Sequence, residues 1–197
     1  TVDILDFGIG IPPEKFSSTI LSLQEGNKIT KKYLVGAFGQ GGSSTLSFCE
    51  YVLVISRHVQ NPNVVSFTVI KEITLSEEYK DNCYAYLALK NEKGELTVPS
   101  FSLNEPITLY DSTDKLRLNE FKHGTLVRHY SFRLTGISKA IGPREGNLYH
   151  YLHCSLFDPL IPFQIIDLRK KEEKPNQQIS TGSRNRLMKL TTKEDSE

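Results

Sequence analysis

The residues best suited to chemistry lie in two glycine-rich segments near the start of the chain. In the first, Asp6-Phe7-Gly8-Ile9-Gly10, a carboxylate is followed by two glycines, which allow positive φ and a close backbone approach to a ligand. The second, residues 36–44, carries successive backbone N–H groups at the start of an expected helix. Such N–H groups bind phosphate without a side-chain charge. Together the segments predict a nucleotide site.

Three well-known nucleotide-binding motifs do not fit these segments. A dinucleotide fingerprint beginning at Gly8 would place its third glycine at Pro13. A P-loop beginning at Gly36 has the right spacing, but Gly42 occupies the position of the phosphate-binding lysine. Asp6-Phe7-Gly8 spells the magnesium-binding tripeptide of protein kinases, yet no HRD segment precedes it and no APE segment follows. The two segments therefore match none of these three motifs.

Taken together with a third segment, both glycine-rich segments resemble the GHKL ATPases. This family groups DNA gyrase B, the ninety-kilodalton heat-shock chaperones, sensor histidine kinases and MutL. Residues 6–11 resemble its DxGxG motif, residues 36–44 resemble its GxxGxG lid, and Gly124-Thr125-Leu126-Val127 resembles its GT-x-V element. The resemblance covers residues 1–135, and the GAFGQG form of the lid is nearest to the chaperone-like and MORC-like branches.

The resemblance implies the residues that would contact the adenine of ATP. Asp6, as a buried carboxylate, would accept a hydrogen bond from the 6-amino group and so reject guanine. Gly8 and Gly10 would let the backbone pass close to the base, and Ile11 would form an apolar wall. Thr125 would support the adenine pocket, although a threonine there is also an ordinary strand residue.

The lid would supply the phosphate contacts. Phe38 would anchor the lid hinge by packing, and backbone N–H groups would hold the β- and γ-phosphates. The residues implied are Gly36, Phe38, Gly39, Gln40, Gly41, Gly42 and Ser43. Lys28 is a further candidate for a phosphate contact, but Lys31 and Lys32 offer the same chemistry, and solvated charge is the simpler interpretation of all three.

The resemblance leaves open whether ATP is hydrolysed. In the family, a helix before DxGxG carries the Mg²⁺-binding asparagine and, in hydrolysing branches, the glutamate that activates water. The catalytic residues are therefore expected upstream of Thr1, and no residue of this chain is expected to bind the metal. The implied function is an ATPase that uses ATP and Mg²⁺ as a switch, with lid closure and a homodimer of ATPase heads. The alternative is a nucleotide-sensing interaction module that binds ATP without hydrolysis.

The elements that must position these residues follow from the apolar pattern. Period-two alternation predicts a strand over residues 2–7, and Phe16, Ile20 and Leu23 predict a helix opened by Pro12-Pro13. Further helices are expected over 43–50 and 147–157, and a hairpin at 91–94. Strands are expected over 51–56, 64–74, 83–90, 95–101 and 126–134.

With the family resemblance, this order predicts an α/β two-layer sandwich. Its sheet is mixed and mostly antiparallel with helices on one face, the Bergerat-type ATP-binding fold, partial at the N-terminus. Residues 1–135 are expected to form the ATP-binding domain. Residues 136–197 are expected to be an extension or linker toward a transducer domain, and their polar end from 168 onward a linker or frayed tail.

The composition of the chain limits the compartment and the partners that we expect for it. The 197 residues carry a net charge of +1. The three cysteines are widely spaced, which favours a reducing, cytoplasmic compartment. Apolar runs such as 51–55 are far too short for a membrane helix, and residues 168–197 are too weakly basic to support a nucleic-acid partner. His150, His153 and Cys154 could suggest zinc, but without a second pair of ligands nearby packing is the favoured interpretation.

Overall fold

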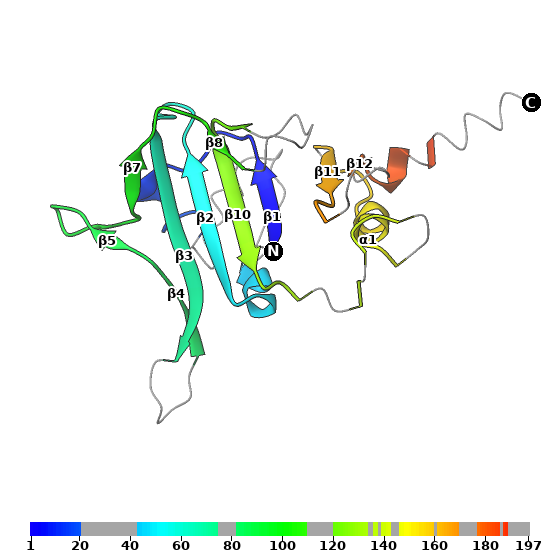
Figure 1. Cartoon of the computed structure of the whole chain (residues 1–197), viewed down its shortest axis with the longest axis horizontal. Coiled ribbons are helices and arrows are strands. Elements are labelled where there is room, and N and C mark those ends of the chain that lie inside the picture. Colours follow the sequence, from blue (N-terminus) through cyan, green and yellow to red (C-terminus); the bar gives the residue numbers. More distant parts are fainter. Residues whose placement is uncertain are drawn as a thin grey trace, which may run out of the picture. The chain divides into compact units, whose positions relative to one another are not determined.

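The computed structural model describes residues 1–20, 43–74, 82–109, 120–133, 136–137, 139–142, 146–159, 161–169, 177–185 and 187–188. The chain divides into two compact units, Thr1–Arg133 and Leu134–Glu197. Within the described ranges the structure is mixed α/β, with mostly antiparallel strands in open sheets and few helices (Figure 1). No helix in these ranges is long and apolar enough to cross a bilayer.

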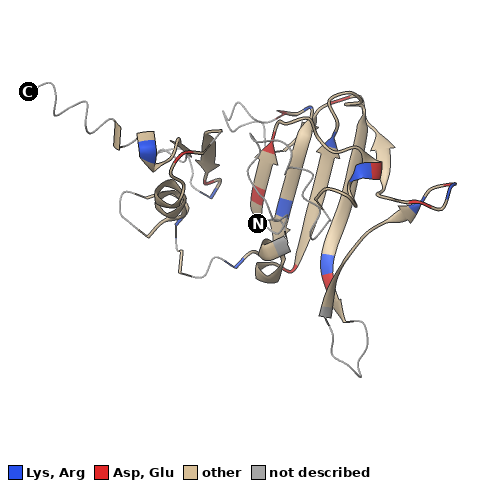
Figure 2. Cartoon of the chain, turned by 180° about the vertical axis from the view of Figure 1, so that it is seen from behind, with Lys and Arg blue, Asp and Glu red and all other residues tan. Residues whose placement is uncertain are grey.

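One antiparallel sheet forms the centre of the first unit. Its strands are, in spatial order, β1 (Val2–Asp6), β10 (Gly124–Tyr130), β2 (Tyr51–Arg57), β3 (Val64–Thr74) and β4 (Asn82–Tyr86), with β7 (Ser100–Ser102) also paired to β3 (Figure 1). β2 and β3 are rich in β-branched and aromatic residues, which favour strands. Most of the length of these strands is uncharged (Figure 2). The strand predicted over 64–74 is present with the same bounds, and those predicted over 2–7, 51–56 and 126–134 are present with shifted ends.

Two predicted strands are interrupted. The segment over 83–90 divides into β4 and β5 (Leu89–Lys90), because the chain leaves the sheet after Leu87, whose N–H donates to the Val69 carbonyl at 3.0 Å. The segment over 95–101 divides into β6 (Leu96–Thr97) and β7 at Pro99, which lacks the N–H that a strand would use. β5 and β6 form the predicted hairpin, and β8 (Ile107–Thr108) pairs with β9 (Glu120–Phe121).

The helix predicted after Pro12 is wrong in type and length within the described residues. Only a 3-10 helix forms there, η1 (Pro13–Lys15). The Thr19 hydroxyl donates to the Lys15 carbonyl at 2.6 Å, a side-chain bond that competes with a continuing helix. Leu23 lies outside the described residues. The short helix predicted at residue 43 is also a 3-10 helix, η2 (Ser43–Phe48).

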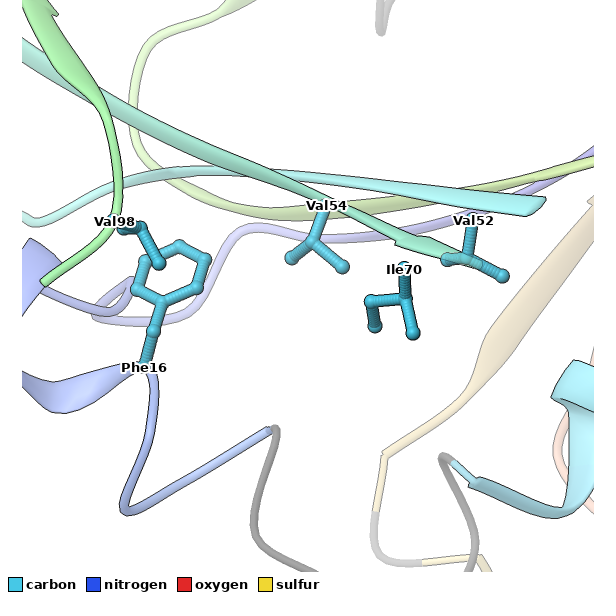
Figure 3. Packing of buried hydrophobic residues seen from close by; sticks show 5 residues of the cluster. All are labelled: Phe16, Val52, Val54, Ile70 and Val98. Atoms are coloured by element: carbon cyan, nitrogen blue, oxygen red, sulfur yellow. The ribbon is translucent and has the colours of Figure 1, made fainter. Parts of the chain in front are cut away.

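The core lies on one face of the sheet. Val52, Val54 and Ile70 project from β2 and β3 toward Phe16 and Val98, and Phe16 and Val54 are fully buried (Figure 3). Other partly buried apolar side chains pack against this cluster: Ile11, Ile20, Leu46, Cys49, Tyr86 and Val127. The segments around η1 and η2 therefore cover this face of the sheet.

In its described residues, the second unit contains the helix α1 (Leu148–Ser155), short helical segments at 183–185 and 187–188, and one pair of strands. α1 begins at Asn147, whose side-chain oxygen accepts the His150 N–H at 2.9 Å. β11 (Phe163–Ile166) pairs with β12 (Gln177–Ser180). The expectation of a frayed tail from residue 168 onward is wrong for β12, because its pairing with β11 satisfies the backbone hydrogen bonds of a polar sequence.

Candidate functional site

Strand register brings two of the three predicted motifs together. β1 and β10 are antiparallel, and Asp6 lies directly opposite Thr125. On the other side of β10, Thr125 lies opposite Ser56 of β2. Directly opposed residues of an antiparallel pair have their side chains on the same face of the sheet. Asp6, Thr125 and Ser56 therefore form one row across three strands, at the end of β1 where the glycine-rich turn begins.

Two glycines of the motifs occupy positions that exclude a side chain. Gly10 has φ +72°, and a Cβ there would lie 2.1 Å from the carbonyl oxygen of Arg57. Gly124 has φ +111°, and a Cβ there would lie 2.0 Å from the carbonyl oxygen of Asp6. L-residues rarely adopt such φ values, and both contacts are with backbone atoms that cannot turn aside. The turn after β1 packs this closely only because both residues are glycine.

The carboxylate of Asp6 is exposed, and the prediction that it is buried is wrong for the described structure. Asp6 is the last residue of an edge strand, and its Oδ1 turns back to accept the N–H of Gly8 at 2.8 Å. This is a common local bond of aspartate at turns. A Cβ at residue 8 would lie 2.7 Å from the same Oδ1, so glycine also gives the carboxylate room.

The backbone of the turn is held at three groups, the carbonyls of Gly8 and Ile9 and the N–H of Ile11. His123 Nδ1 lies 3.0 Å from the Gly8 carbonyl, and because a carbonyl only accepts, the imidazole donates. The Val59 N–H donates to the Ile9 carbonyl at 2.8 Å. The Ile11 N–H donates to Ser56 Oγ at 2.7 Å. The turn is therefore fixed from β2, from the residues after β2 and from the residue before β10.

Ser56 is a site residue that the sequence interpretation missed. It is fully buried, its hydroxyl donates to the Gly124 carbonyl at 2.9 Å, and its Oγ lies 3.3 Å from Thr125 Oγ1. A signal was present in the sequence, because Ser56 continues the buried period-two row of Val52 and Val54 with a polar residue. A polar side chain on an apolar face needs partners, and both motifs supply them.

Arg57 is a second residue without an earlier prediction. It is 2% exposed, and its guanidinium donates to four backbone carbonyls at 2.6–3.2 Å: those of Pro62, Leu103, Glu105 and Phe121. Burial lowers the pKa of this guanidinium from its ordinary value. Arg57 therefore fixes the connections around the strand end on which Gly10 packs.

Comparison with known proteins does not assign the chain to a family. The sequence matches no family model, and no curated protein matches it significantly.

Of the residues predicted to contact the phosphates, the structure describes only Ser43, in η2. Lys28, Lys31, Lys32, Gly36, Phe38, Gly39, Gln40, Gly41 and Gly42 lie outside the described residues. Ser43 begins η2, and Thr45 Oγ1 lies 2.9 Å from Nε2 of His129 in β10. His129 is 2% exposed, and burial lowers its pKa, while the Val2 backbone and the Asp3 carboxylate act in the opposite direction. η2 is thus tied to the strand that carries Thr125.

No cluster of three or more histidine, cysteine, aspartate or glutamate side chains suited to a metal ion occurs within the described ranges. In the second unit, Cys154 Sγ lies 3.7 Å from His150 Nε2. His153 instead faces Ser180, with its Nδ1 2.8 Å from the serine Oγ, and stacks on Tyr149. The imidazole of His153 therefore joins α1 to β12.

Proposed function

We propose that the first unit is an ATP-binding domain of the GHKL type. The observation that carries the proposal is the placement of Asp6 opposite Thr125, beside a turn that Gly10 and Gly124 allow to pack closely. Two motifs from opposite ends of the unit thus meet at one point, as a shared adenine site requires. The proposal includes a two-layer sandwich with helical segments on one face of the sheet, supported by the packing of Phe16 and of residues from η2 on that face.

Adenine recognition would depend on the exposed carboxylate of Asp6. One oxygen, Oδ1, holds the Gly8 N–H, which leaves Oδ2 to accept a hydrogen bond from the 6-amino group. Guanine carries a carbonyl oxygen at that position, which a carboxylate repels. An exposed carboxylate suits a ligand that arrives from solvent, because the base itself would then cover it.

ATP binding would act as a conformational switch through the lid and η2, which follow the Asp6 segment in the sequence. The lid would close over the β- and γ-phosphates, and η2, bonded to β10 through Thr45 and His129, would transmit the closure to the sheet. Mg²⁺ would accompany the phosphates, and the described residues offer no cluster of their own to hold it.

We propose ATP hydrolysis and a homodimer of ATPase heads as the outcome. A phosphate-release assay distinguishes this ATPase from a nucleotide-sensing module, because the module would bind ATP without releasing phosphate.

Substituting Asp6 tests the proposal. Asp6→Asn keeps an oxygen for the Gly8 N–H but replaces the free acceptor with an amide that can present N–H groups to the 6-amino group. We expect ATP affinity, measured by titration calorimetry, to fall at least about a hundredfold, because the bound base would cover residue 6 and leave polar groups there without a partner.

The matched control is Glu72→Gln, which removes one negative charge from an exposed position of β3 in the same sheet. It should bind ATP as the wild-type protein does. Equal ATP affinity in the Asp6→Asn and wild-type proteins, or no ATP binding by the wild-type protein, would contradict the proposed function.

A further inference from the structure

The hydroxyl of Ser56 has a fixed set of hydrogen-bond roles. A serine hydroxyl carries one proton and two lone pairs. The Ile11 N–H, at 2.7 Å, can only donate, so it takes one lone pair. The Gly124 carbonyl, at 2.9 Å, can only accept, so it takes the Ser56 proton. One lone pair of Ser56 is left, and the remaining neighbour is Thr125 Oγ1 at 3.3 Å.

This arrangement orients the Thr125 hydroxyl. Because Ser56 has no second proton to give, the bond between the two hydroxyls forms only when Thr125 donates its own proton. Ser56 is fully buried and Thr125 is 7% exposed, so water competes little for that bond. The Thr125 oxygen then has only lone pairs to offer to any other partner.

Thr125 and Asp6 would consequently act as two acceptors in one row. They are register partners of β10 and β1, with side chains on the same face of the sheet. A base edge with an amino group supplies protons to both acceptors. A carbonyl oxygen at position 6 supplies no proton, because the proton of a 6-oxopurine edge lies on N1, and it leaves two acceptors facing an acceptor at that position.

We infer that Ser56 is a specificity-determining positioning residue: it holds the Thr125 hydroxyl as an acceptor, so that the site selects a 6-aminopurine over a 6-oxopurine nucleotide. The inference rests on the proposed function and assigns base selection to a residue that does not itself reach the base. Loss of the Ser56 hydroxyl frees the Thr125 proton, and Thr125 can then donate to a carbonyl oxygen at position 6.

The experiment measures the dissociation constants of ATP and ITP by calorimetry, because inosine carries an oxygen in place of the 6-amino group. In Ser56→Ala, we expect the ratio of the ITP constant to the ATP constant to fall about tenfold, the size of one hydrogen-bond mismatch. The matched control is Ser66→Ala, since Ser66 lies opposite Ser56 on β3 and is 1% exposed. It should keep the wild-type ratio.

The ratio of the ITP and ATP dissociation constants distinguishes a change in base specificity from a general loss of structure. Ser56→Ala also leaves the Ile11 N–H without its acceptor, which would weaken binding of both nucleotides and leave their ratio unchanged. In a Thr125→Val background, which lacks the hydroxyl that Ser56 orients, Ser56→Ala should change the ratio no further.

Each result decides a different claim. If the wild-type protein binds neither nucleotide, the proposed function fails. If it prefers ATP and Ser56→Ala keeps the same ratio, the inference about Ser56 is wrong while the proposed function stands. If circular dichroism shows that Ser56→Ala is unfolded, the Thr125→Val variant alone tests the inference. A ratio lowered about tenfold supports the acceptor role of Thr125, and an unchanged ratio overturns it.

Discussion

At the scale of single residues, the candidate site depends on backbone positions that tolerate no side chain. Gly10 and Gly94 both have positive φ, but their surroundings differ. A Cβ at Gly10 would overlap the Arg57 carbonyl, whereas a Cβ at Gly94 would have no heavy atom within 4 Å. The pair therefore separates the cost of the backbone conformation from the cost of close packing.

We predict different stabilities for Gly10→Ala and Gly94→Ala. Gly94→Ala should lower the free energy of unfolding by about 1 kcal/mol, the cost of a left-handed alanine. Gly10→Ala should lower it by at least about 3 kcal/mol, because the chain must also move the strand end that carries Arg57. Urea unfolding followed by circular dichroism measures both, and equal losses would contradict the close packing of this turn.

Part of this site could be predicted from residue types, because these residues act on their immediate neighbours in the sequence. Asp6, Gly8 and Gly10 act through the turn that they themselves form, so their spacing in the sequence carries the information. Ser56 and Arg57 act through partners far along the chain, up to 69 residues away for the Thr125 contact. Such partners are set by strand register, which short sequence patterns do not specify.

At the scale of elements, strands were easier to predict than helices. β2 and β3 contain long runs of β-branched and aromatic residues, and their existence follows from composition alone. The segment after Pro12 shows helical periodicity in its apolar residues, but Thr19 bonds to the preceding turn, and up to residue 20, where the described part ends, the helix formed is a 3-10 helix. Local hydrogen bonding thus outweighed periodicity there.

The contact between η2 and β10 predicts a pH dependence. Burial lowers the pKa of His129, so the folded protein keeps this imidazole neutral where an unfolded histidine, with a pKa of about 6.5, takes up a proton. The unfolded state therefore gains protons first as the pH falls. We expect the free energy of unfolding to decrease from pH 6.5 to 5.5, by at most about 1.4 kcal/mol per pH unit from this group.

A variant of His129 and a control without a titratable group test whether His129 causes this decrease with pH. His129→Gln removes the titrating group and should flatten the decrease in urea unfolding experiments at pH 6.5 and 5.5. Gln60→Ala changes an exposed residue beyond the end of β2 that carries no titratable group, and it should leave the slope as in the wild-type protein. Identical slopes in His129→Gln and the wild-type protein would show that His129 does not titrate between the two states.

At the scale of the whole molecule, the two units differ in how much they bury. The first unit contains the cluster around Val52, Val54 and Phe16. In the described part of the second unit, the buried apolar side chains are Ile141 and Ile165. Apolar burial is the main source of stability, so the second unit should be the weaker one.

Hydrogen exchange measured by mass spectrometry at increasing urea concentrations tests this difference. We expect the amides of α1 and β11 to exchange at lower urea than those of β2 and β3, because separate compact units open separately. The matched reference is the amides of β10, which should behave like β2. A single urea midpoint for all five elements would show that the two units unfold together.

The buried Arg57 guanidinium also determines where the chain can change in length during evolution. It binds the carbonyls at Glu105 and Phe121, so both ends of the segment between them are fixed to one side chain. A segment with anchored ends can gain or lose residues at small entropic cost, since closure entropy grows slowly with length. Insertions between Glu105 and Phe121 should therefore be tolerated, whereas lysine cannot replace Arg57 and keep all four carbonyls bonded.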